Sequence, residues 1–175
     1  ATKKVEGLDV TLSINSNEQK EFFKKLDEFV LKEAHENSVA WFGKQLSETE
    51  LSIMYTSPFK SNDATKYDPN YKAKLNLSGL DRYLTRFSVL SSEDGSVNQG
   101  AGWQFLEPLL QENKWRGNTT RVVIEARRVW VVGRKFGLSL NITDMATKLN
   151  SSSGRREAFT DDDDALDALR ALGCA

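Results

Sequence analysis

The stretch that decides the fold lies late in the chain, where two strand-like segments follow one another. Thr119–Trp130 (TTRVVIEARRVW) and Lys135–Met145 (KFGLSLNITDM) flank a Val-Gly-Arg corner at 132–134. Both segments are rich in β-branched and aromatic residues, and a short glycine-containing corner between two such segments is a hairpin signal. The sequence therefore predicts an antiparallel β-hairpin here.

Alternation within this hairpin divides its side chains between two faces. One face is apolar and suits a core: Val122, Ile124, Ala126, Phe136, Leu138, Leu140 and Ile142. The other face is polar and suits solvent: Arg121, Arg127, Lys135, Ser139 and Asn141. We expect the hairpin to bury the first face and to present the second.

Shorter signals predict the elements before the hairpin. Period-2 alternation predicts three strands: Leu8–Ile14, Tyr71–Leu77 and Tyr83–Leu90. Helical spacing predicts a helix over 18–35, capped by Ser16 or Asn17, with these apolar residues on one face: Phe22, Phe23, Leu26, Phe29 and Val30. Ser47 and Glu50 fit a capping box for a short helix that ends near Tyr55.

Turn composition predicts loops at Pro58–Pro69 and Glu93–Ser96 and a flexible segment at Gly100–Gly102. Trp103–Leu110 fits either a short helix that Pro108 interrupts or a strand edge. With about five strands and one or two inserted helices, the chain is predicted to be mainly β (α+β). A small antiparallel barrel suits this content better than a sandwich.

The chain has 175 residues, of which 39% are hydrophobic and 28% charged, so we expect one domain with a core. Its net charge of −1 is unevenly spread, because residues 161–175 hold five Asp and one Arg, which leaves 1–160 at +3. Ser151–Gly154 (SSSG) reads as a joint. We therefore predict a domain over 1–150 and a flexible acidic C-terminal tail over 151–175.

Two further features bound the class of protein. Cys174 is the only cysteine and has no partner for an internal disulfide, and neither a signal peptide nor a long apolar run is present. An intracellular, reduced setting without a membrane partner is the expectation.

Little in the sequence suits catalysis. His35 is the only histidine and sits at the end of a predicted helix, so no Ser-His-Asp or Cys-His arrangement is in prospect. The spacing of Gly95 and Gly100 suggests a phosphate-binding loop, but the lysine of that motif is absent. We predict no enzyme activity, no cofactor and no metal site.

Cationic and aromatic side chains gather on the strands after residue 70. Single-stranded nucleic acid is held by cations that replace phosphate counterions and by aromatic faces on which bases stack. The predicted DNA-binding residues are Lys72, Lys74, Arg82, Arg86, Trp115, Arg116, Arg127, Trp130, Arg134 and Lys135; Lys60, Lys66 and Arg128 belong to the wider set, and Trp41 and Tyr83 are further stacking candidates. The structural alternative is that the cations are solvated and the tryptophans belong to the core.

The acidic tail begins with Asp161, Asp162, Asp163 and Asp164, and leucines at 166, 169 and 172 follow them. Such a tail could compete with nucleic acid for the cationic side chains. It could also form a short amphipathic helix that docks on a protein partner. A solvated acidic end without either role is the third interpretation.

The order of elements resembles the OB-fold single-stranded DNA-binding proteins of podophages and their relatives in large DNA viruses of algae. In that family a strand and a short polar turn lead into an amphipathic helix, as Leu8–Ile14 and Asn17–His35 do here. Asn37–Tyr55 (NSVAWFGKQLSETELSIMY) looks like the viral branch, and Phe136–Leu140 (FGLSL) is similar to the family's last barrel strands. The acidic end after a Ser/Gly joint is a further family trait, although this chain ends without the terminal aromatic residue of the phage tails.

The resemblance implies an OB-like barrel over 1–150 and a sequence-nonspecific single-stranded DNA-binding protein of viral DNA replication or recombination, acting in the host cytoplasm or nucleus. It also implies strand annealing, a homodimer and recruitment of replication proteins through the tail. Two alternatives stay open. An RNA-binding module has the same surface, and a non-catalytic structural or scaffold protein would use the hairpin edge and the tail for protein contacts.

Overall fold

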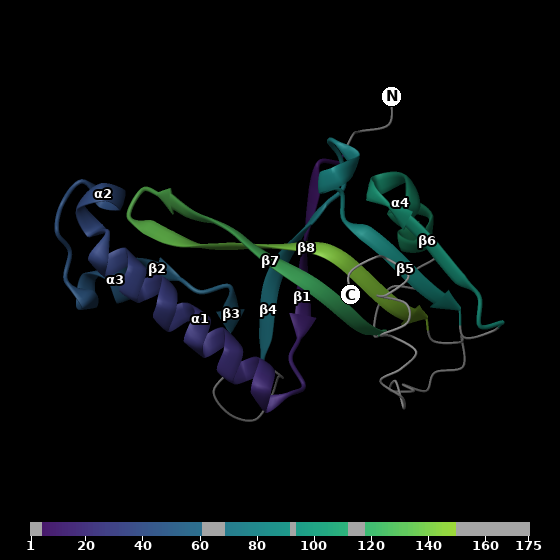
Figure 1. Cartoon of the computed structure of the whole chain (residues 1–175), viewed down its shortest axis with the longest axis horizontal. Coiled ribbons are helices and arrows are strands. Elements are labelled where there is room, and N and C mark those ends of the chain that lie inside the picture. The colour runs from purple at the N-terminus through teal and green to yellow at the C-terminus, as the bar shows by residue number, and fades with distance from the viewer. Residues whose placement is uncertain (1–4, 61–68, 92–93, 112–117, 150–175) are drawn as a thin grey trace. The chain divides into compact units, whose positions relative to one another are not determined.

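The computed structural model describes residues 5–60, 69–91, 94–111 and 118–149 (Figure 1). These residues divide into two compact units, and four long strands contribute to both. The first unit, called the helix unit below, comprises Asp9–Ala73 and Ala126–Leu140. The second, called the sheet unit, comprises the described residues of Ala1–Leu8, Lys74–Glu125 and Asn141–Ala175.

The described elements follow one another in a mixed order of strands and helices. The first six are β1 (Gly7–Ser13), α1 (Asn17–Glu36), α2 (Ser38–Phe42), α3 (Glu48–Met54), β2 (Tyr55–Thr56) and β3 (Phe59–Lys60). The next four are β4 (Asn70–Asn76), the 3-10 helix η1 (Asp81–Tyr83), β5 (Arg86–Ser91) and β6 (Val97–Ala101). The last three are α4 (Gly102–Gln111), β7 (Thr119–Val132) and β8 (Lys135–Leu149).

The eight strands of the described residues form one open mixed sheet in the order β1-β4-β8-β5-β6, with β2 and β7 also paired to β8 and β3 paired to β4. The predicted α+β class is thereby confirmed. A closed antiparallel barrel is not what these strands show, because β8 runs parallel to β2, β4 and β5. Parallel partners need long crossover connections, so local alternation in the sequence does not reveal them.

Helix α1 forms as its spacing predicts but buries a narrower face. The Ser16 hydroxyl accepts a hydrogen bond from the Glu18 amide at 3.1 Å, which caps the helix. Phe23 and Val30 are buried, whereas Phe22 and Phe29 are each 58% exposed. Successive residues advance about 100° around a helix, so an apolar pair of neighbours cannot both point into the core.

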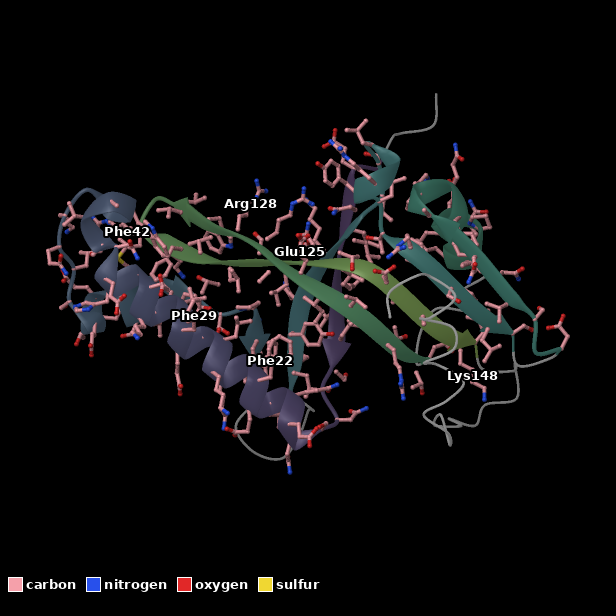
Figure 2. All side chains as sticks on the ribbon, viewed as in Figure 1. Phe22, Phe29, Phe42, Glu125, Arg128 and Lys148 are labelled. Carbon is pink, nitrogen blue, oxygen red and sulfur yellow. The ribbon has the colours of Figure 1, made fainter. Side chains whose placement is uncertain are left out.

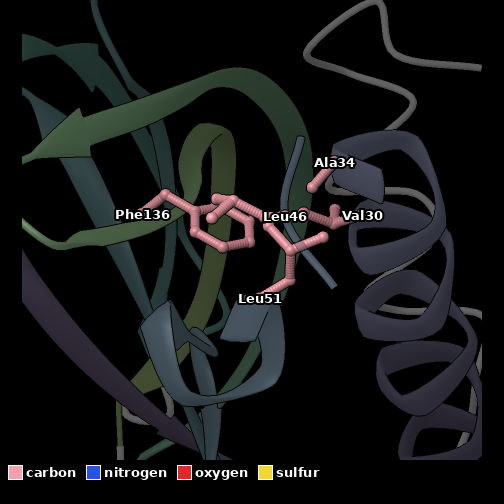
Figure 3. Close-up of a cluster of buried hydrophobic side chains, with 5 residues drawn as sticks. All are labelled: Val30, Ala34, Leu46, Leu51 and Phe136. Atoms are coloured by element: carbon pink, nitrogen blue, oxygen red, sulfur yellow. The ribbon is translucent and has the colours of Figure 1, made fainter. Parts of the chain in front are cut away.

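The core of the helix unit gathers around Phe136 of β8 (Figure 3). It contains these buried side chains: Val30, Ala34, Leu46, Leu51 and Phe136. The ring of Phe136 lies 5.2 Å from that of Phe42, in an edge-to-face arrangement. The predicted capping box of α3 is confirmed, because the side chains of Ser47 and Glu50 each bond the other's backbone amide.

A second aromatic contact joins α1 to the strands of the helix unit. The ring of Phe23 stacks on that of Phe59 at 5.7 Å and approaches that of Tyr71 at 4.6 Å. Burial raises the pKa of Tyr71 to about 12. The predicted loop Pro58–Pro69 is therefore wrong at Phe59 and Lys60, which form β3 against β4, while residues 61–68 lie outside the described residues.

In the sheet unit, α4 packs on the β5–β6 hairpin. The rings of Phe87 and Phe105 stack at 5.9 Å, and Leu106 is fully buried. Trp103–Leu110 is thus helical, and Pro108 lies within the helix. The flexible segment predicted at Gly100–Gly102 is wrong, because these glycines end β6 and begin α4.

Close packing explains those two glycines better than flexibility does. A β-carbon at Gly100 would collide with the ring of Phe105, and Gly102 has a φ of 69° in the left-handed region that favours glycine. Three smaller predictions also differ. The strand expected from Tyr83 begins at Arg86, Asn141 is buried and Ala126 is exposed.

A polar network holds β2 against α1. The Tyr55 hydroxyl donates to one oxygen of Asp27 at 2.6 Å, and the Ser57 hydroxyl donates to the other at 2.5 Å. Burial raises the pKa of the Asp27 carboxyl despite these two hydrogen bonds, which lower it. Burial and the neighbouring carboxylate also raise the pKa of Tyr55.

This network predicts a pH dependence of stability. Because folding raises the pKa of Asp27, its carboxyl binds a proton more readily in the folded protein than in the unfolded chain. Its titration should therefore lower the free energy of unfolding as pH rises through the interval above the carboxyl's ordinary pKa. Urea unfolding of wild type and Asp27→Asn between acid and neutral pH measures this contribution, since asparagine does not titrate. We expect wild type to lose stability relative to the variant as pH rises; the opposite trend would contradict the burial argument.

Candidate nucleic-acid interface

The hairpin of β7 and β8 closes through a two-residue turn at Gly133 and Arg134. Gly133 has a φ of 60°, the left-handed conformation that tight hairpin turns require. A turn of this length places Thr120 opposite Thr147, and the hydroxyl oxygens of these two residues lie 3.2 Å apart. The same register places Trp130 opposite Gly137.

Trp130 lies across the backbone of Gly137. A β-carbon at position 137 would come within 2.7 Å of Cζ2 and 2.9 Å of Cε2 of the indole, and within 2.6 Å of the Thr56 carbonyl oxygen. Trp130 is half-buried, so the residue keeps part of its surface exposed to solvent. Only glycine leaves room for this arrangement, which makes the indole a platform held against β8.

Gly137 is a residue of the candidate site that our sequence reasoning missed. The available signal was a glycine inside an otherwise apolar strand, which often marks close approach of another group to the backbone. Its position next to Phe136 suggested only a family resemblance. The contact with Trp130 gives it a physical role.

Three residues share the face of Trp130 on which a ligand could lie. Side chains alternate along a strand, so Arg128 lies on the same face, and the hairpin register adds Lys135 and Ser139 from β8. We call Arg128, Trp130, Lys135 and Ser139, with Arg134 at the turn, the hairpin outer face. Arg128 points away from the ribbon (Figure 2).

The structure places Arg127 on the other face of the ribbon, with Val129, which packs against the core cluster. The sequence-based division of the hairpin therefore mixes its two faces. A two-residue turn pairs even positions of β7 with odd positions of β8, so equal parity along both strands does not mean one face. Arg127 is exposed and makes contacts of its own.

The cations of the hairpin outer face differ from those of α1 in their ion pairs. Arg128, Arg134 and Lys135 are exposed and form no ion pair with any residue that the structure describes. Lysines on α1 differ, since Lys24 lies 3.2 Å from Glu21 and Lys32 lies 3.8 Å from Glu36. Residues 119–140 hold five cationic side chains and one acidic one, so the hairpin is an anion-attracting element.

Arg86 has a structural partner in the sheet unit. Its Nε atom lies 2.6 Å from Oδ1 of Asp144, a buried carboxylate whose other oxygen accepts a hydrogen bond from Thr143. The Arg86 contact is an ion pair and not an aligned hydrogen bond. A buried carboxylate without a counter-charge is strongly destabilising. Arg86 therefore stabilises the fold by neutralising the charge of Asp144.

The other predicted DNA-binding cations that the structure describes belong to β4 and η1 and not to the hairpin. In the sheet unit, the Arg82 guanidinium stacks 4.7 Å from the ring centre of Tyr83, and both side chains are exposed. Lys72 and Lys74 occupy the solvent positions of β4, as predicted, and the stem of Lys74 lies close over Gly7. Trp115, Arg116 and the aspartates Asp161–Asp164 lie outside the described residues.

The structure therefore brings together Trp130, Arg134 and Lys135 of the predicted site with Arg128 of the wider predicted set, and it adds Gly137. In the part of the chain that is described, no helix combines the length and the apolar character needed to cross a membrane.

One part of the chain is similar to a known family. Residues 2–72 match a family of unknown function (DUF5871). The matched segment contains β1, the helices α1 to α3 and part of β4, and it ends before the hairpin. No curated protein and no solved structure matches the chain.

Proposed function

We propose that this chain is a non-catalytic, sequence-nonspecific single-stranded DNA-binding protein of viral DNA replication or recombination. The observation that carries the proposal is the hairpin outer face, where an indole lies on Gly137 beside three exposed cations that form no ion pair within the described residues. Phosphates of a strand would meet Arg128, Arg134 and Lys135. A base would stack on the open part of Trp130.

This arrangement suits single strands better than duplexes. An indole can stack on a base only where the base face is free, and such stacking contributes about 1–3 kcal/mol per base. The neutral hydrogen-bonding groups of the hairpin outer face are the Ser139 hydroxyl and the Trp130 indole N–H, so it has few such groups with which to read base edges. Binding without sequence preference follows.

The family resemblance supports the finer parts of the proposal. The sheet would belong to an OB-like, partly open barrel, and the protein would act inside the infected host cell. It would anneal complementary strands and form a homodimer. Its acidic tail would contact the cationic surface or replication proteins. An OB-fold is itself only partly closed, which is compatible with the open mixed sheet of the described strands.

The proposal predicts binding that falls with salt. If three cations each neutralise one phosphate, log K should fall against log salt with a slope near −2, at roughly 0.7 per phosphate on single strands. Titrating thymidine oligonucleotides over a salt series, with matched uridine oligonucleotides and a duplex of equal length, measures this slope and the preference.

Each comparison in that experiment separates one alternative. Tighter binding of the uridine oligonucleotide would favour the RNA-binding module, and equal affinity for the duplex would contradict the stacking argument. Absence of salt-dependent binding to any oligonucleotide would favour the scaffold protein.

A further inference from the structure

The tip of the hairpin exposes aliphatic side chains among cations. Val132 is 70% exposed and Val131 is 45% exposed, and both precede the turn formed by Gly133 and Arg134. A tight turn on a solvated ribbon needs no apolar residue, and polar residues are usual at such positions. The two adjacent valines therefore expose apolar surface at the end of the hairpin.

Each valine places an aliphatic side chain on one face of the tip. Successive residues of a strand point to opposite faces, so Val131 and Val132 flank the ribbon at one level. Val132 shares the face of Trp130, and Lys135 lies opposite it across the hairpin. Val131 shares its face with Val129 and Phe136, which belong to the core, so Val132 is the aliphatic side chain that the outer side of the tip presents next to the cationic turn. This side has the form of a wedge against which the last base pair of a duplex could lie.

The spacing along the outer face agrees with this interpretation. Val132 and Trp130 are two residues apart on an antiparallel strand, which corresponds to about 6.8 Å. Bases in a stacked strand are about 3.4 Å apart, so the two side chains are separated by two base steps. A strand that leaves a base pair at Val132 could therefore place a base on Trp130 while keeping its normal stacking distance.

We propose that the hairpin tip recognises the junction between duplex and single-stranded DNA. Val132 caps the last base pair, the departing strand continues onto Trp130, and Arg134 and Lys135 meet the phosphates at the fork. Apolar side chains inserted at base steps are an established means by which proteins unstack and kink DNA. The inference rests on the proposed function and narrows its preferred substrate.

Charge and size favour nucleic acid over an anionic membrane as the occupant of this tip. The cations are distributed along the ribbon as well as at the turn, as a strand of phosphates requires. Two valine side chains could bury only a few carbon atoms in a membrane. Even a single long acyl chain, which buries many more, gives only marginal membrane binding.

The experiment compares a duplex carrying a single-stranded tail with the isolated tail strand and with the blunt duplex. Wild type should bind the tailed duplex about five- to tenfold more tightly than the isolated strand, as expected for partial burial of one valine. Val132→Thr, which keeps the side-chain shape, should remove that preference. Its affinity for the isolated strand should stay within about twofold of wild type, since Val132 makes no phosphate contact in the proposed arrangement.

A matched control is available on α2. Val39 is 59% exposed and lies outside the hairpin, so Val39→Thr should retain the full preference for the tailed duplex. Equal loss of preference in both variants would overturn the wedge, because the effect would then be general.

The remaining outcomes separate this inference from the function on which it rests. Wild type that binds the isolated strand but shows no preference for the tailed duplex would overturn the wedge alone. Wild type that binds no oligonucleotide would overturn the proposed function and the wedge together. Binding to phosphatidylserine vesicles that Val132→Thr weakens, without a junction preference, would overturn the wedge in favour of a membrane contact.

Discussion

Replacing Arg128, Arg134 and Lys135 together by glutamine is expected to weaken single-stranded DNA binding about 100-fold at about 0.1 M salt. Each cation that neutralises a phosphate releases roughly 0.7 of a counterion, and at this salt concentration each release is worth about fivefold in affinity. The three side chains are exposed and unpaired among the described residues, so their loss should leave the fold intact. Fluorescence anisotropy with a labelled thymidine oligonucleotide measures the change.

The matched control removes the same charge from α1. Lys24, Lys25 and Lys32 are exposed, and two of them already form ion pairs with glutamates. Changing all three to glutamine should weaken binding only through the general field, by a few-fold at most under screening conditions. Equal weakening by both triple variants would show that net charge alone governs binding and that the hairpin outer face is not a site.

Replacing Phe136 by alanine is expected to lower the free energy of unfolding by about 3–5 kcal/mol. Phe136 is fully buried at the centre of the helix-unit core, where it contacts the rings of Phe42 and Tyr55. Removing its ring leaves a cavity that neighbouring elements can fill only partly. Chemical denaturation monitored by circular dichroism measures the loss.

Phe22→Ala is the appropriate comparison, because it removes the same ring from a position that is 58% exposed. We expect this variant to change the free energy of unfolding far less, by about 1 kcal/mol or below. A large loss at Phe22 with a small loss at Phe136 would contradict the assignment of the helix-unit core.

Local signals in the sequence predicted the elements that local interactions form. The hairpin, the capped helix α1 and the capping box of α3 each depend on residues a few positions apart, and all three are present. The strand β6 escaped prediction because its residues, VNQGA, carry no apolar alternation, and its pairing with β5 supplies what its side chains do not.

Long-range pairing could not be predicted in the same way. The parallel contacts of β8 with β2, β4 and β5 join segments far apart in the chain, and no local pattern specifies them. The same limit applies to the site. The sequence indicated Trp130, Arg134 and Lys135, but the role of Gly137 depends on a register that only the closed turn fixes.

Arg86 shows why an exposed cation in a sequence list is weak evidence for a phosphate contact. Its neighbour Asp144 is 58 positions away in the chain and paired with it in the sheet, so nothing in the sequence links the two. Because that carboxylate is buried, the ion pair that Arg86 forms with it stabilises the fold, whatever further contact Arg86 makes.

A protein with Trp130 as its only tryptophan reports directly whether a base stacks on that indole. Such a variant carries Trp41→Phe, Trp103→Phe and Trp115→Phe, and its comparison retains Trp103 in place of Trp130. Titration with poly-dT should quench the fluorescence of the Trp130-only protein strongly and that of the Trp103-only protein little, because Trp103 lies in α4 and is not part of the hairpin outer face. Saturable binding without quenching of Trp130 would show that no base stacks on this residue.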